Sequence, residues 1–153
     1  METEELLINE LDIKDLSSRR QDNYLIMTII YCQLSSLYGG KYPISVFEIY
    51  EDITGKSYND ASTFVQNCVY QVTKNFSYIV NVFQQELIAW RWTRLPRIIQ
   101  AILLMSYAHY YYLPNEPKTK AIVIEIAIKL TNIYYGDKEN AKFVNAILDK
   151  VLV

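Results

Sequence analysis

Residues 63–87 read TFVQNCVYQVTKNFSYIVNVFQQEL. Apolar side chains return there every three or four positions over roughly six turns, which is the spacing of one face of an α-helix. The stretch lacks the two-residue alternation that marks a half-buried β-strand. It is therefore predicted to be helical, either as one long helix or as two helices with a bend near Asn75.

The same spacing continues toward the beginning of the chain. Residues 19–37 carry apolar side chains on one helical face, and the pair Gly39-Gly40 ends that helix. Pro43 then stands where a first-turn proline is favoured, which predicts a short helix up to Ile53.

Helical spacing also fills the second half of the chain. Pro96 predicts the start of a helix whose apolar pattern runs to Tyr107. Residues 122–133 are apolar on nearly all sides, which predicts a buried central helix. Asp137 can cap the last helix.

The helical pattern is interrupted at residues 90–97, which read WRWTRLPR. The tryptophans are expected to pin a junction there and the arginines to lie over it. The alternative is that this mixture stacks on single-stranded bases. The sequence thus predicts one all-α domain over residues 1–153, with about seven helices in sub-bundles of about 1–88 and 94–153.

Composition excludes several classes of protein. The chain has 153 residues, of which 51% are hydrophobic, with four glycines, four prolines and a net charge of −2. Such a chain can build a core and is neither a disordered tail nor a basic coat for nucleic acid. The acidic start and the lack of an apolar run near ~18 residues favour a soluble, cytoplasmic protein without a membrane partner.

The inventory of catalytic and metal-binding residues is small. Cys32, Cys68 and His109 are the only cysteines and histidine, and they form neither a disulfide framework nor a zinc spacing. No nucleophile or orienting acid can be assigned to His109, which is expected to be a partly buried helical side chain. We expect no catalytic residue, no metal and no cofactor, and hence no enzyme.

Two further places could bind a partner. Arg19-Arg20 begins a helix, where the helix dipole disfavours cations, so the pair is either a solvated first turn or a phosphate contact. In the last helix Lys142 shares a polar face with Asn145, and Phe143 lies beside that face.

These residues carry a resemblance to a known family. Residues 142–149, KFVNAILD, closely resemble the K-F-V-N-G-x-L-D signature of the NusB family of bacterial transcription antitermination factors. Weaker elements agree in order and spacing from about residue 18 to 150, namely Trp90-x-x-x-Arg94-Leu95, Val72-x-x-Asn75 and the Arg19-Arg20 pair.

The resemblance implies two packed three-helix bundles with an additional helix. It also implies binding of a single-stranded boxA element of ribosomal RNA leader transcripts, together with a small-subunit ribosomal protein, at the RNA polymerase elongation complex. Carried over by position, Arg19 and Arg20 would contact phosphates. Glu139, Lys142 and Phe143 would lie on the same RNA-facing surface.

The sequence also departs from the family pattern. Ser18, Gln21 and Asp22 replace or dilute the further arginines that are usual in the amino-terminal motif, and Ala146 replaces a glycine. Having fewer phosphate-binding arginines weakens RNA binding and its salt dependence. The alternative hypothesis is a NusB-like protein-interaction module, homodimeric in one version, with reduced or lost RNA binding. The run Tyr110 to Tyr112 favours it, because a helix cannot bury three consecutive side chains on one stripe and tyrosine is enriched at interfaces.

Overall fold

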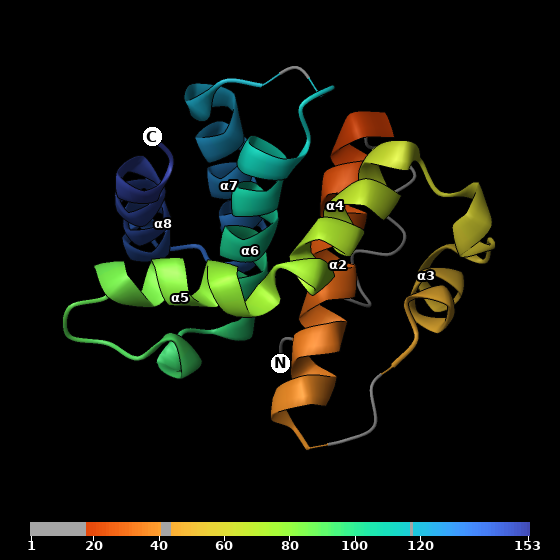
Figure 1. The fold of residues 1–153 in the computed structure, drawn as a ribbon, viewed down its shortest axis with the longest axis horizontal. Helices are drawn as coiled ribbons and strands as arrows, with labels where there is room; N and C mark the ends of the chain where they lie inside the picture. Colours follow the sequence, from red (N-terminus) through yellow and green to blue (C-terminus); the bar gives the residue numbers. More distant parts are fainter. Residues whose placement is uncertain (1–17, 41–43, 117) are drawn as a thin grey trace.

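The computed structural model describes residues 18–40, 44–116 and 118–153, which fold into helices without any strand. The predicted first-turn position of Pro43 lies outside these residues. The α-helices are α2 (Ser18–Tyr38), α3 (Val46–Thr54), α4 (Thr63–Lys74), α5 (Phe76–Glu86), α6 (Arg97–Tyr112), α7 (Lys120–Tyr134) and α8 (Lys138–Val151), and two 3-10 helices are η2 (Tyr58–Asp60) and η3 (Trp92–Arg94) (Figure 1). The prediction of an all-α fold with about seven helices is confirmed. Within the described residues, no helix combines the length and apolarity needed to cross a bilayer.

Helix boundaries follow residues that satisfy free backbone groups. Asp137 caps α8 as predicted, because its carboxylate accepts from the backbone N–H groups of Glu139 and Asn140. At the end of α3, Gly55 takes a left-handed conformation with φ 72°, which a residue with a Cβ adopts only with strain.

The long apolar stretch is divided into two helices. Asn75 lies between α4 and α5 with φ −108° and ψ 17°, outside helical geometry. Its side-chain amide donates to the backbone carbonyl of Gln71 at 2.9 Å, which compensates that end of α4. Of the two alternatives, the bend near Asn75 is confirmed.

The central helix is α6, and the prediction that residues 122–133 form it is wrong. Residues 98–109 of α6 are all buried, and α6 packs against α2, α4 and α7. Ile122 and Ile133 of α7 are instead 44% and 46% exposed. Apolar side chains are common on protein surfaces, so an apolar segment does not by itself reveal how many neighbours cover it.

Trp92 fixes the connection between α5 and α6. Its ring is buried and stacks on Phe83 at 5.8 Å, and its indole N–H donates to the Tyr38 hydroxyl at 3.0 Å. Trp90 is 59% exposed, so one of the two tryptophans has the expected anchoring role. The division into sub-bundles at residues 88–94 stays a prediction.

Two isoleucine substitutions compare the central helix with the outer one. Ile102→Ala removes a fully buried side chain of α6 and is expected to lower the free energy of unfolding by about 2–5 kcal/mol. Ile122→Ala, on the exposed side of α7, is expected to lower it by less than about 1 kcal/mol. Urea unfolding of both variants at one pH measures the difference, and equal decreases would contradict a central α6.

Candidate nucleic-acid interface

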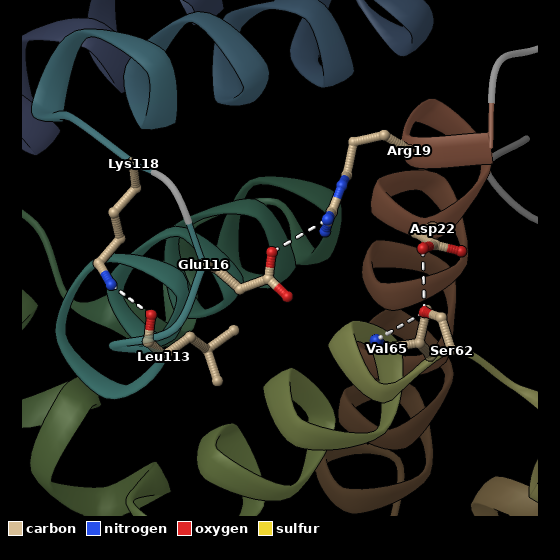
Figure 2. A network of polar contacts seen from close by, with 7 residues as sticks. All are labelled: Arg19, Asp22, Ser62, Val65, Leu113, Glu116 and Lys118. Atoms are coloured by element: carbon tan, nitrogen blue, oxygen red, sulfur yellow. Dashed lines mark hydrogen bonds and ion pairs between the residues drawn. The ribbon is translucent and has the colours of Figure 1, made fainter.

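Arg19, in the first turn of α2, is held by two contacts from distant parts of the chain. Its guanidinium lies 2.9 Å from the Glu116 carboxylate in the connector between α6 and α7 (Figure 2). The same group lies 4.1 Å above the ring of Phe64 in α4. These two attractions offset the unfavourable position of a cation at a helix start. The Arg19 side chain is still 51% exposed, so one side of the guanidinium faces solvent.

Asp22 connects the same region of α2 to the start of α4. The Ser62 hydroxyl donates to the Asp22 carboxylate at 2.9 Å and accepts from the backbone N–H of Val65 at 3.1 Å (Figure 2). The carboxylate therefore orients the cap of α4. Asp22, one of the residues that the sequence analysis named as departures, therefore has a structural role.

A cleft of about 470 Å³ lies between the beginning of α2 and the outer side of α7. Three basic side chains, Arg19, Arg20 and Lys129, line it together with Leu130 and Ile133. The Asn23 side-chain oxygen is also at this cleft, buried and without a hydrogen-bond partner. Cationic groups over an apolar floor suit a ligand with phosphates on one side and flat apolar rings on the other.

A second groove, of about 700 Å³, lies between α7 and α8. Lys129 of α7 lines this groove as well as the cleft between α2 and α7. Its floor is formed by Ile124 and Ile128 and its rim by ion-paired side chains. These pairs are Lys129 with Glu125 and Lys120 with Asp149, each at 3.0 Å.

The structure separates the predicted site residues into two groups. Arg19 and Arg20 lie at the start of α2, whereas Glu139 and Lys142 lie on α8, with α7 between them (Figure 1). Phe143 is half-buried and packs against the core. A ligand that touches both groups must cross the ridge of α7, a helix roughly 10 Å wide.

Three residues of this region were not predicted from the sequence as binding-site residues, namely Phe64, Glu116 and Lys129. Phe64 reads as a core residue in the apolar pattern, and it is buried. Glu116 lies 97 positions from its partner Arg19, so no local pattern connects them. Lys129 could have been found from its charge within an apolar helix, which marks an exposed position.

His109 is buried beside this region, next to the Phe64 ring. The two ring centres are 5.0 Å apart in an edge-to-face arrangement, and the histidine is 6% exposed. Burial is the main cause that lowers the pKa of His109 from 6.5 to about 4, the charges of Lys118 and Arg19 act in the same direction, and Glu116 opposes the shift. Within the described residues, no group of three or more His, Cys, Asp or Glu side chains could hold a metal ion.

The lowered pKa makes stability depend on pH. Because the folded-state pKa lies below the unfolded value of 6.5, the contribution is complete above pH 6.5 and is lost as the pH falls toward 4. Between these limits, the free energy of unfolding should fall by up to about 3 kcal/mol more in wild type than in His109→Gln. Urea unfolding across the range measures this, and NMR of the single histidine gives the pKa directly. An imidazole that titrates near 6.5 would contradict its burial.

Comparison with known proteins agrees with this fold. The NusB family model matches residues 45–153. The transcription antitermination protein NusB of Buchnera aphidicola subsp. Cinara cedri is 30% identical over 137 residues, 89% of this chain and 91% of that protein. NusB of Bacillus licheniformis is 29% identical over 92 residues, 60% of this chain and 69% of that one.

Two solved structures share the fold. T. maritima NusB superposes with a TM-score of 0.71 at 20% identity, over 89% of this chain and 91% of that one. A chain in the crystal structure of a plectonemic RNA supercoil gives a TM-score of 0.69 at 18% identity, over 89% and 94%. With a family match over most of its length and a relative aligned over most of both chains, this chain belongs to the NusB family.

Proposed function

We propose that this protein is a transcription antitermination factor that binds a boxA-like single-stranded RNA together with a small-subunit ribosomal protein, at the RNA polymerase elongation complex. The observation that carries the proposal is the cleft between α2 and α7, which places Arg19, Arg20 and Lys129 around an apolar floor. Family membership supports the same function, because the curated relatives are transcription antitermination proteins. No catalytic role is proposed for any residue.

The RNA backbone would lie along the mouth of the cleft. The planar guanidinium groups of Arg19 and Arg20 suit phosphate oxygens, and the contact with the Phe64 ring helps to orient the guanidinium of Arg19. A phosphate at Arg19 competes with Glu116, an exchange that costs little because partly exposed ion pairs are weak. Bases or riboses would then cover Ile133 on α7.

The α8 residues would contact a neighbouring part of the strand. Beyond the ridge of α7, Lys142 offers one more cation and Glu139 can accept from base amino groups. Phe143 would act by supporting this helix face from the core side.

The charge balance predicts weak binding by this protein alone. Residues 1–17 hold six acidic residues and one lysine, which leaves 14 basic and 11 acidic residues for positions 18–153 out of the 15 and 17 in the chain. That part is thus only modestly positive. A basic ribosomal-protein partner would add the phosphate contacts that are missing here.

Binding to a boxA-like single strand, with and without the ribosomal protein and at several salt concentrations, tests the proposal. Arg19→Ala/Arg20→Ala is expected to weaken binding and to lower the salt slope by up to about 1.4, since each phosphate that is no longer neutralised lowers it by ~0.7. The matched control is Lys56→Ala/Lys74→Ala, which removes the same charge from exposed positions after α3 and at the end of α4. It should leave the slope unchanged.

Equal weakening in both double variants would mean that bulk charge and not this cleft holds the RNA. The absence of binding in every mixture, with a folded protein and a partner that binds a control factor, would refute the RNA-binding function.

A second candidate function is a protein-interaction module, a homodimer in one version. The exposed Ile122 and Ile133 of α7 favour it, since interfaces bury such side chains. Equilibrium sedimentation decides this: Ile133→Lys should abolish association if α7 forms the interface, and a wild type that is monomeric at all concentrations excludes the homodimer.

A further inference from the structure

A small pocket of about 210 Å³ lies next to Arg19, since its lining includes Phe64 and Glu116, the two residues that contact the Arg19 guanidinium. It is formed by α4 and by the end of α6 with its connector. Its lining includes two aromatic rings and a set of amide and carboxylate groups, from Phe64, Asn67, Gln71, Tyr112, Asn115 and Glu116. The larger clefts beside α7 have floors of isoleucine and leucine, so this pocket differs from them in its polar wall.

The connector side of the pocket is held in place by three contacts. The Lys118 ammonium donates to the Leu113 carbonyl, and the backbone N–H of Glu116 donates to the same carbonyl at 3.2 Å. On the far side, the Glu116 carboxylate is paired with Arg19. Figure 2 shows Glu116 and Leu113 between Lys118 and Arg19. The pocket wall is therefore preorganised before any ligand arrives.

The polar groups of the pocket have unused hydrogen-bonding capacity. Among the described residues, the Asn67 amide has no hydrogen-bond partner. Gln71 uses its oxygen to accept from the Asn75 amide at 3.1 Å, which leaves its NH₂ group as a donor. Glu116 uses Oε2 for Arg19, and Oε1 takes no part in that bond. The pocket thus offers amide donors and acceptors together with a carboxylate acceptor.

These groups match the edge of a purine with an exocyclic amino group. An asparagine or glutamine amide pairs with adenine by accepting from N6 and donating to N7, and a carboxylate accepts from an amino group. The half-buried Tyr112 ring supplies an aromatic surface. Proteins that bind single-stranded RNA commonly stack an unpaired base on such a ring.

We propose that this pocket binds one base, adenine, of the strand whose phosphates contact Arg19 and Arg20. The inference rests on the proposed RNA-binding function and names the residue that reads a base, Asn67. Arg19 joins the two functions, because it contacts Glu116 and Phe64 of the pocket wall while it lines the phosphate cleft.

The first experiment needs no RNA. Side-chain amide resonances of the ¹⁵N-labelled protein are followed by NMR during titration with adenosine 5′-monophosphate, uridine 5′-monophosphate and ribose 5-phosphate. The adenine nucleotide is expected to shift the Asn67 and Gln71 amides, and ribose 5-phosphate is expected to leave them unchanged. Absence of any shift, or equal shifts with ribose 5-phosphate, would overturn the pocket assignment.

The second experiment measures how strongly wild type and a variant bind an intact RNA strand and a strand that lacks one base. Asn67→Ala should weaken binding of a boxA-like strand about tenfold and leave the salt slope unchanged. The same variant should bind like wild type to the strand made abasic at the adenine that the pocket reads. Asn81→Ala, an exposed asparagine on α5, is the matched control and should affect neither strand.

The two proposals fail in different ways. If wild type binds RNA and Asn67→Ala reduces binding equally to every strand of an abasic series, the pocket proposal fails and the RNA function stands. If wild type binds no RNA while the adenine nucleotide shifts the amides, the pocket is a nucleotide site and the proposed function fails.

Discussion

The burial of α6 on all sides is the constraint from which the surface features follow. Residues 98–109 have no exposed face, so every direction around this helix must be occupied by another element. The occupants are chiefly α2, α4 and α7. Residues 23–31 of α2 are themselves all buried, whereas α4 and α7 turn only one side inward. As neighbours around α6, they bring the start of α2 close to α4 (Figure 1) and to α7, with which it forms a cleft. The cleft and the pocket lie where these outer helices meet.

The surroundings of Arg19 show how weak contacts can define a site. An exposed ion pair stabilises by ~0–1 kcal/mol and a cation–π contact by a similar amount, so neither Glu116 nor Phe64 alone fixes the guanidinium. Together the two contacts orient the Arg19 guanidinium so that its remaining side faces solvent. Two further contacts hold the same region, because Asp22 orients the cap of α4 and the His109 ring packs on the Phe64 ring.

Helix content was predictable from the sequence because apolar spacing and caps are local, as at Asp137 and in residues 63–87. Which helix is central could not be predicted. Residues 122–133 are more uniformly apolar than an outer helix needs. In contrast, α6 contains the polar residues Gln100 and Ser106, whose side chains are buried and donate to backbone carbonyls. Of the candidate site, Arg19, Arg20 and Lys142 could be named from their charge and position, and the resemblance gave them an expected role in RNA binding. Glu116 could not be found, since its pairing with Arg19 exists only after the connector returns to α2.

Several basic groups of this surface have acidic partners, which constrains how it can bind RNA. Arg19 pairs with Glu116, Lys129 with Glu125 and Lys120 with Asp149. A phosphate that arrives at such a group replaces a carboxylate, so the net electrostatic gain is smaller than for an unpaired cation. Affinity and selectivity must then come from elsewhere, namely a partner protein and contacts to the bases. The amide-lined pocket beside Arg19 provides such base contacts without adding charge.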